Sequence, residues 1–326
     1  SNLKKFLSAA AVLAFSATAA LAAIPFAACS ENGGGSSQGE NNDKLITVDK
    51  NHSADIISTA QGDIRTQSSG RVYYVAPDGS IANDGLSWDS PYSIVEILKG
   101  GDITLQPGDT VYVKPGTYTI VNMVTAPADI SGAYNKYIRI VNAALEKDRS
   151  GYTGSETLAT LDFSGQNFGS AERGVQLYGN YFYWYGIDVC GAGDNGLYIA
   201  GSYNIVENCE FYNNRDTGLQ LGRMQSSDTT IDLWPSFNLV KNCTSHNNYD
   251  NETYGENADG FAAKLTVGYG NVFDGCIAYR NSDDGWDLYA KSESGNIGQV
   301  IIYNSVAYEN GYLEYDQRTC NRMYST

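Results

Sequence analysis

The sequence predicts an all-β fold in which short strands repeat as stacked coils, that is, a solenoid. The first observation is composition: the 326 residues include 35 Gly and 25 Tyr but only 7 Pro, with abundant Asn, which favours short strands and tight turns over helices. The second is strand-like alternation of Val, Tyr and Ile, interrupted by Pro-Gly and Asp-Gly turns. The third is a glycine-centred motif that recurs along the chain. A chain of this length can bury a large core.

The N-terminus predicts an export segment. Lys4 and Lys5 precede an apolar, Ala-rich run over residues 6–28, the pattern of a secretory signal. The run ends in FAAC, which resembles a bacterial lipobox, so we expect residues 1–29 to be a lipoprotein-type signal and Cys29 to be lipidated. A plain secretory signal with an incidental cysteine is the alternative. Both interpretations place the protein outside the cytoplasm of a bacterium, secreted or on the outer surface, and the only membrane contact expected is a lipid anchor on Cys29.

Residues 30–70 are expected to form a flexible tether, because residues 30–43 are rich in Gly, Ser, Asn and Glu and the rest carry little pattern. The folded domain is expected over residues 71–326. Two of its first segments, RVYYVAPDGSIANDGLSWDSPYSI and LQPGDTVYVKPGTYTI, resemble the opening of secreted right-handed parallel β-helix proteins, in which the first segment caps the helix and the second begins its coils. The resemblance implies that fold here.

Internal repetition supports the prediction independently. The motif reads NGLYI at 195–199, TGLQL at 217–221, DGFAA at 259–263 and DGWDL at 284–288. The long gap before DGFAA predicts one coil with inserted loops within residues 225–235 and 248–257. Two further sets of residues recur from coil to coil as columns. The first contains Ile187, Cys209, Cys243, Cys276 and Ser305, and the second contains Asn214, Asn248, Asn281 and Asn310, each five residues after a member of the first.

The asparagine column predicts a ladder in which side-chain amides of successive coils bond one another and the turn backbone. The cysteines Cys209, Cys243 and Cys276 are expected to act as small buried hydrophobic residues. Stacked coils lie about 4.8 Å apart, so a disulfide between neighbours is the open alternative.

The columns also predict which side chains face outward. The first and third residues after each glycine are apolar and are expected inside. The second residues, expected outside, are Tyr198, Gln220, Ala262 and Asp287, and the fourth include Lys264. The residues just before the glycines are Asn195, Thr217, Asp259 and Asp284, so acidic residues occupy that position in two consecutive coils.

This acidic cluster predicts a cation site. Adjacent coils would hold Asp259 and Asp284 roughly 4.8 Å apart, with Asp283 and Asp287 beside them, and uncompensated carboxylates at that distance repel strongly. Hard oxygen ligands without Cys or His favour Ca²⁺. The alternative is that Asp-Gly simply forms good turns and the acids are solvated. We interpret Asp194 and Asp216, in earlier coils, as turn residues.

Charge and histidine content exclude other classes of protein. The formal net charge is −16 and no basic stripe occurs, so nucleic acid is not expected as a partner. His52 and His246 are far apart in the sequence, which leaves little basis for imidazole-based zinc or triad chemistry. Catalysis would therefore depend on carboxylates, lysine or arginine. We expect a monomer.

The segments ENADGFAAKL, GNVFDGC and NSDDGWDLYAK resemble the signature of family 9 pectate lyases, which are secreted parallel β-helix enzymes. The resemblance covers residues 71–313 and is most specific from Asn242 onward. It implies that Asp259, Asp283, Asp284 and Asp287 bind a catalytic Ca²⁺. It also implies cleavage of an acidic polysaccharide, pectate or polygalacturonate, by β-elimination to 4,5-unsaturated uronides.

The catalytic base departs from the family pattern. The family carries a lysine in a GNGFK-like motif one coil after the aspartates, whereas here VAYENGYL continues into EYDQRTCNRMYST. We therefore expect the given chain to be C-terminally incomplete, with the base beyond Thr326. Lys264, expected to face outward about 8 Å from Asp287, is another candidate base and a candidate contact for a substrate carboxylate, or else a solvated surface lysine.

Further candidates and alternatives remain open. Lys291 is a second candidate substrate contact, and Lys291 and Arg322 are further candidates for the base. Tyr198, Tyr289 and Trp184 could form a sugar-stacking platform or be structural. Alternative functions are another polyuronate lyase or an epimerase on the same fold, and a non-catalytic carbohydrate-binding β-helix.

Overall fold

The computed structural model describes residue 64 and residues 70–169, 172–250 and 253–311. The predicted signal, Cys29, most of the tether and Arg322 lie outside these residues. Within the described part of the chain, no helix has both the length and the apolar character needed to cross a bilayer.

Strands dominate, and they form three parallel sheets. Sheet A, in spatial order, consists of β1 (Val72–Val75), β2 (Thr110–Val113), β5 (Ile138–Asn142), β8 (Phe182–Tyr185), β11 (Ile205–Glu207), β14 (Leu239–Lys241), β17 (Asn271–Asp274) and β20 (Val300–Tyr303). Sheet B consists of β3 (Gly116–Thr119), β6 (Ala159–Asp162), β9 (Ile187–Cys190), β12 (Glu210–Tyr212), β15 (Thr244–His246), β18 (Ile277–Tyr279) and β21 (Val306–Tyr308). Sheet C consists of β4 (Val124–Ala126), β7 (Val175–Leu177), β10 (Leu197–Ile199), β13 (Leu219–Leu221), β16 (Phe261–Ala263) and β19 (Trp286–Asp287).

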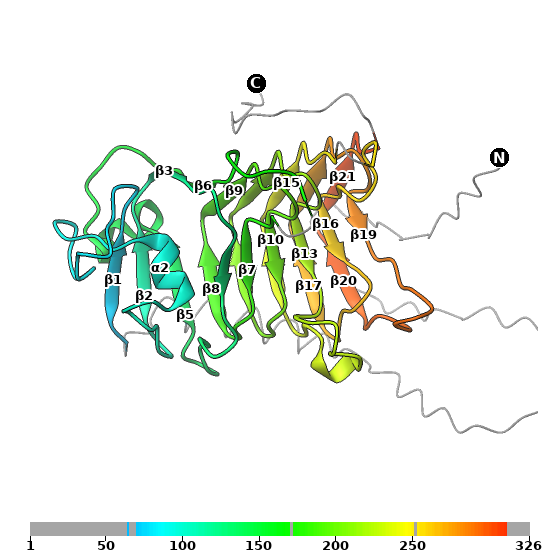
Figure 1. Cartoon of the computed structure of the whole chain (residues 1–326), viewed down its shortest axis with the longest axis horizontal. Coiled ribbons are helices and arrows are strands. Elements are labelled where there is room, and N and C mark those ends of the chain that lie inside the picture. Colours follow the sequence, from blue (N-terminus) through cyan, green and yellow to red (C-terminus); the bar gives the residue numbers. More distant parts are fainter. Residues whose placement is uncertain (1–63, 65–69, 170–171, 251–252, 312–326) are drawn as a thin grey trace, which may run out of the picture.

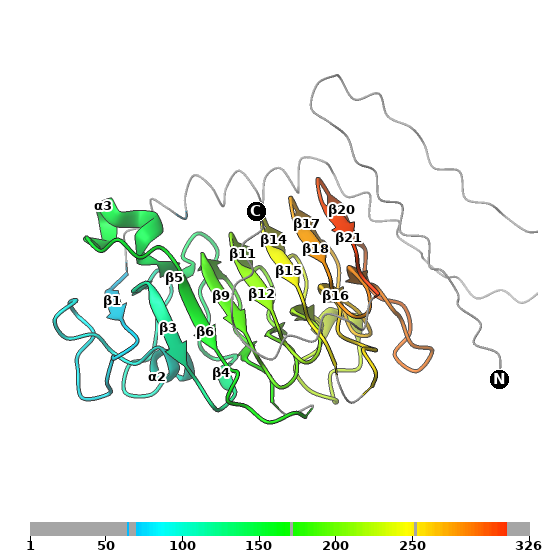
Figure 2. The same ribbon diagram turned by 90° about the horizontal axis from the view of Figure 1, so that it is seen from above.

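Each coil between the first and the last contributes one strand to each sheet, so successive coils stack along one long axis (Figures 1 and 2). The blue N-terminal coils lie at one end and the orange and red coils at the other (Figure 1). This architecture is a parallel β-helix, and it confirms the all-β solenoid expected from the repeats. The long repeat between β13 and β16 is one coil with an insertion, as predicted. The coil contains β14 and β15, and the insertion includes the 3₁₀ helix η2 (Ile231–Leu233), within the predicted region 225–235.

The sharp corners between sheets A and B explain part of the Asn and Gly content. Gly186, Asn208, Asn242, Gly275 and Asn304 occupy the same corner in successive coils, and all have φ between 49° and 67°. A left-handed backbone conformation costs most residues about 1–2 kcal/mol, because the Cβ atom approaches the following carbonyl oxygen. Gly has no Cβ and avoids this cost, and Asn tolerates the conformation well. These residue types therefore let two strands meet at a two-residue corner without strain elsewhere.

The interior of the coil is apolar and continuous. The first and third residues of the sheet C strands point into it, and Leu197, Leu219, Phe261 and Phe273 are fully buried there. Cys209, Cys243 and Cys276 belong to the same core and are free thiols. Their predicted role as small buried residues is confirmed, and the disulfide alternative among these three is wrong.

The predicted asparagine ladder is also present. Asn214 donates from Nδ2 to Asn248 Oδ1 at 3.0 Å, Asn248 to Asn281 Oδ1 at 2.8 Å, and Asn281 to Asn310 Oδ1 at 2.9 Å. Because the amides are buried, each must find its partner in the next coil. The structure adds a second, unpredicted ladder at another corner, formed by Asn204, Asn238 and Asn271.

In the described part of the chain, helices are few and short. The helix α2 (Ile94–Lys99) starts at Ser93, whose hydroxyl accepts from the backbone N–H of Glu96, and stops at Gly100, which is left-handed. Its buried Ile97 and Leu98 join the main core at the N-terminal end of the coil stack (Figure 1). The remaining short elements, the 3₁₀ helix η1 (Ala143–Glu146) and α3 (Lys147–Ser150), leave sheet A at the end of β5.

Candidate metal centre

The acidic residues lie where the chain enters strands of sheet C. Backbone hydrogen bonds link one coil to the next, from Gly196 N to Thr217 O, from Gly218 N to Asp259 O and from Gly260 N to Asp284 O. The residues before the glycines therefore form one spatial column, as the sequence predicts. Asp259 and Asp284 are neighbours in this column, at the starts of β16 and β19.

Three carboxylates converge. One oxygen from each of Asp259, Asp283 and Asp284 lies within 4.8 Å of the others. Calcium binds oxygen at about 2.3–2.6 Å, so two ligands of one ion can be up to roughly 5.2 Å apart. The spacing of the three carboxylates therefore fits a single Ca²⁺, and the donor set is all oxygen.

Asp259 is held most firmly. Its side chain is fully buried; Oδ1 accepts from the backbone N–H of Asp284 at 3.2 Å, and Oδ2 accepts from Thr217 Oγ1 at 3.0 Å. Asp283 Oδ2 accepts from the backbone N–H of Asn257 at 3.0 Å. These bonds orient two of the three carboxylates before any ion arrives, which lowers the cost of binding.

The structure places Lys264 differently from the prediction. Its side chain is only 9% exposed, and Nζ lies 2.8 Å from Asp259 Oδ2 and 2.9 Å from Asp287 Oδ2. The expected separation from Asp287 and the alternative of a solvated lysine are wrong, because two carboxylates in adjacent coils attract the ammonium group. Asp287 thus faces Lys264, while its Oδ1 accepts from the backbone N–H of Tyr289 at 2.8 Å; it is not among the three converging carboxylates.

The electrostatics follow from this packing. Burial by itself would lower the pKa of Lys264. The combined attraction of Asp259 and Asp287 outweighs this effect, so the pKa is raised. Burial raises the pKa of Asp259, and Lys264 opposes that shift. The pKa of Asp284 is raised by burial and then by repulsion from Asp283 and Asp287. Four carboxylates against one ammonium leave excess negative charge, which a divalent cation would offset.

Two other acidic residues were misjudged from sequence. Asp194 and Asp216 are not isolated turn residues, because their carboxyls interact: burial and then the charge of Asp216 raise the pKa of Asp194 to about 7. Arg173 Nε lies 3.4 Å from Asp194 Oδ2. The repeat could have shown the pair, since Asp194 and Asp216 each stand two positions before their glycines, Gly196 and Gly218.

The aromatic platform considered from sequence does not form. Trp184 is fully buried and donates from Nε1 to Ile187 O, and Tyr198 is 5% exposed. Of the three aromatic residues, only Tyr289 is exposed. The outward positions of sheet C are nevertheless in register as expected, since Tyr198 pairs with Gln220, Gln220 with Ala262, and Ala262 with Asp287.

A pocket of about 470 Å³ lies beside this row of outward residues. We call it the arginine pocket. It is lined by Arg173, Tyr198, Gln220, Arg223, Leu265 and Lys291, among others. Sequence reasoning missed both arginines. Extending the repeat one coil backward would have placed Arg173, because RGVQL at 173–177 fits the motif and β7 pairs with β10.

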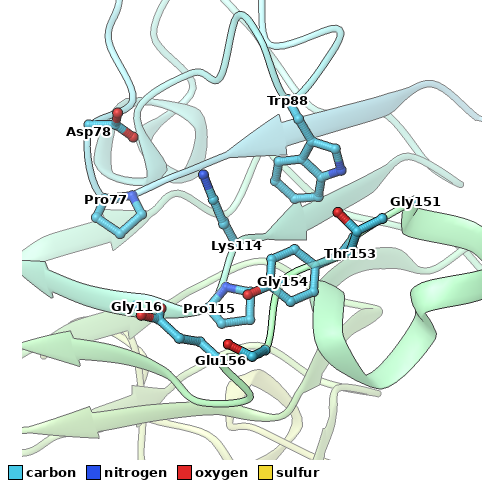
Figure 3. A pocket seen from close by; sticks show the side chains of 12 residues that line it. Pro77, Asp78, Trp88, Lys114, Pro115, Gly116, Gly151, Thr153, Gly154 and Glu156 are labelled. Carbon is cyan, nitrogen blue, oxygen red and sulfur yellow. The ribbon is translucent and has the colours of Figure 1, made fainter.

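A second pocket, of about 620 Å³, lies at the N-terminal end of the coil stack. We call it the Lys114 pocket. Figure 3 shows Lys114 between Pro77 and Trp88, with Asp78 and Glu156 at its edges. Its residues come from the first coils, whereas the converging aspartates enter β16 and β19 near the other end (Figure 1). The Lys114 pocket is therefore separate from the candidate metal centre.

Comparison with known proteins gives consistent results. A family model described as the Pel9A-like, right-handed β-helix region matches residues 73–322. Pectate lyase L of Paenibacillus polymyxa (strain SC2) is 46% identical over 248 residues, which cover 76% of this chain and 51% of that protein. The chain thus spans about half the length of this relative.

Two solved structures are similar. The crystal structure of pectate lyase Pel9A has a TM-score of 0.62 and 33% identity, covering 77% of this chain and 57% of that one. A rhamnogalacturonan lyase has a TM-score of 0.53 and 25% identity, covering 74% of this chain and 58% of that one. The fold is therefore a right-handed parallel β-helix.

Proposed function

Since the chain belongs to the Pel9A-like right-handed β-helix family, we propose that the protein is a calcium-dependent pectate lyase that cleaves polygalacturonate by β-elimination. The observation that carries the proposal is the convergence of Asp259, Asp283 and Asp284 within 4.8 Å at the starts of neighbouring strands. Relatives of similar sequence are named pectate lyases. The substrate would be an acidic polysaccharide.

The residues fit the proposed ion. Asp259, Asp283 and Asp284 would hold Ca²⁺, and Asp287 remains a predicted fourth ligand that faces Lys264 in this structure. When bound, the ion would attract the uronate carboxylate to an acidic protein and stabilise the negative charge that develops on it during proton abstraction. Without such a cation, the excess charge of the four aspartates would repel the polymer.

β-Elimination needs a base that takes the proton from C5 of the uronate, while the C4–O4 bond breaks and a C4–C5 double bond forms. The leaving O4 takes up a proton. Lys264 is poorly suited to act as the base, because two carboxylates stabilise its protonated form. We propose instead that Lys264 is a positioning residue that holds Asp259 and Asp287 and offsets part of their charge. The GNGFK-like lysine expected beyond Thr326 stays a prediction.

Secretion or surface attachment through Cys29 suits this role, because the protein would encounter a polymer such as polygalacturonate outside the cell. We retain this localisation as part of the proposal. Attachment through Cys29 is tested by metabolic labelling with a fatty acid: wild type is expected to incorporate label, and Cys29→Ser is not. Labelling of both would contradict it.

The direct test of the function is the absorbance of the 4,5-unsaturated product. The natural full-length protein is incubated with polygalacturonate in Ca²⁺ and, separately, in a chelator. Rising absorbance only with Ca²⁺ is expected. Binding of polygalacturonate without cleavage would replace the proposal with a carbohydrate-binding role.

The similarity to a rhamnogalacturonan lyase makes that polymer the second candidate substrate. Parallel assays on alginate and on a glycosaminoglycan test whether the protein is a lyase for another uronan. An epimerase would alter the configuration of the sugar without raising the absorbance. A higher kcat/KM on any of these than on polygalacturonate would reassign the substrate.

A further inference from the structure

The arginine pocket differs in charge from the rest of this acidic protein. Arg173, Arg223 and Lys291 line it against one lining carboxylate, that of Glu293, and Arg173 also pairs with Asp194 at 3.4 Å. The Lys114 pocket has the opposite balance, with Lys114 against Asp78 and Glu156 (Figure 3). In a chain with a formal net charge of −16, a locally positive pocket is an attractive place for an anion.

The arginine pocket lies on the same face of sheet C as the aspartates. Gln220 lines the pocket, and Asp287 lies two strands away from it in the same row, through Ala262. At about 4.8 Å per strand, the separation along the row is roughly 10 Å. Leu265, which also lines the pocket, directly follows Lys264. A polymer lying across these strands would contact both places.

Arg173 is fixed before any ligand binds. Its Nε donates to Asn195 Oδ1 at 3.1 Å, its Nη1 donates to Gln176 Oε1 at 3.0 Å, and its guanidinium carbon lies 3.6 Å from the centroid of the Tyr198 ring. Stacking and hydrogen bonds hold the planar group in one orientation, which reduces the entropy lost when it binds an anion. Tyr198 links it to the next coil, because its hydroxyl donates to Arg223 O at 2.8 Å.

In the part of the chain that the structure describes, the other two cations form no close ion pair, although the charge of Lys291 acts on Glu293. Among the described residues, neither Arg223 nor Lys291 forms an ion pair within 4.0 Å, and Arg223 Nη1 reaches only the backbone oxygen of Asp228, at 3.5 Å. Lys291 is exposed and Arg223 is half-buried. Their charge is therefore available to a ligand.

We propose that the arginine pocket is a subsite that binds carboxylates of the acidic polysaccharide directly, without a metal ion, beside the candidate metal centre. The inference rests on the proposed function and deepens it. Guanidinium groups bind carboxylates through charge-assisted, often paired hydrogen bonds, so the subsite would favour uronates whose carboxyl groups are free. A methyl ester removes the charge and one acceptor, and would lose this interaction.

The test compares Arg223→Gln, Lys291→Gln and the double variant of the natural full-length protein with Lys114→Gln as the matched control. Initial rates on polygalacturonate and on highly methyl-esterified pectin are measured in saturating Ca²⁺, and Ca²⁺ affinity is measured by calorimetry. We expect KM for polygalacturonate to rise about tenfold in each single variant, equivalent to ~1.4 kcal/mol, and further in the double variant. We expect kcat and the Kd for Ca²⁺ to stay within about twofold of wild type.

Two results would overturn the subsite. The first is a KM for polygalacturonate in the double variant that matches those of wild type and Lys114→Gln. The second is an equal rise of KM on the esterified polymer, which would mean that charge recognition is not involved. Both leave the proposed function standing. If wild type itself fails to cleave polygalacturonate, the proposed function fails, and the subsite fails with it.

Discussion

Replacing Lys264 with methionine should strongly destabilise the metal-free protein. Asp259 is fully buried, and Lys264 Nζ, itself 9% exposed, lies 2.8 Å from it. Methionine fills most of the same space but leaves the carboxylate without its cation. Removing one partner of a buried ion pair destabilises a protein by about 3–5 kcal/mol, because the other charge stays buried without compensation. The hydrogen bonds from Thr217 and Asp284 to Asp259 remain. We therefore expect the free energy of unfolding to fall by about 3 kcal/mol, the lower end of this range.

The assay is thermal unfolding in a chelator. For a folded region of about 250 residues, 1 kcal/mol corresponds to roughly 2–4 °C in Tm, so we expect a fall of roughly 6–12 °C. Lys99→Met is the control, because Lys99 and Glu96 form an exposed pair worth at most about 1 kcal/mol. Adding Asp259→Asn to Lys264→Met should restore part of the loss. Equal Tm values for Lys264→Met and Lys99→Met would refute the reasoning.

The remaining predictions concern pH and the ladder. The pKa of Asp194 is raised to about 7 by burial and by Asp216, so the unfolded chain loses this proton first as pH rises. The free energy of unfolding should therefore fall between about pH 4 and pH 7, and urea titrations should show a shallower fall for Asp194→Asn; an unchanged slope would contradict this. Asn248→Ala should lower the free energy of unfolding by about 1–3 kcal/mol, because Asn214 and Asn281 each lose a buried partner. The same titrations should show no change for the exposed Asn296→Ala, and a loss below 0.5 kcal/mol in Asn248→Ala would argue against the ladder.

The columns of the coil could be predicted from the sequence because their register repeats. The glycine motif fixed which residue of one coil pairs with which residue of the next, and the structure pairs Gln220 with Ala262 and Ala262 with Asp287 accordingly. The same register placed the asparagine ladder and brought Asp259 and Asp284 together. Each of these statements depends only on backbone spacing.

The conformations of side chains could not be predicted in this way. Lys264 has a long, flexible side chain, and the local balance of charge decides that its ammonium group lies between Asp259 and Asp287 rather than in solvent. Tyr198 was expected outward, but the outer face of sheet C is covered here, so Tyr198 is buried beneath Arg173. The Asp194 carboxyl interacts with Asp216 for a similar reason, because packing from neighbouring coils encloses both.

Calcium titration calorimetry tests whether the aspartates entering β16 and β19 bind Ca²⁺. Asp284→Asn removes one of the three converging carboxylates, and Asp232→Asn, at an exposed position in η2, is the matched control. We expect wild type and the control to bind Ca²⁺ with the same Kd, and Asp284→Asn to bind at least about tenfold more weakly, a difference of ~1.4 kcal/mol. Undetectable Ca²⁺ binding by wild type, or an unchanged Kd in Asp284→Asn, would contradict the account.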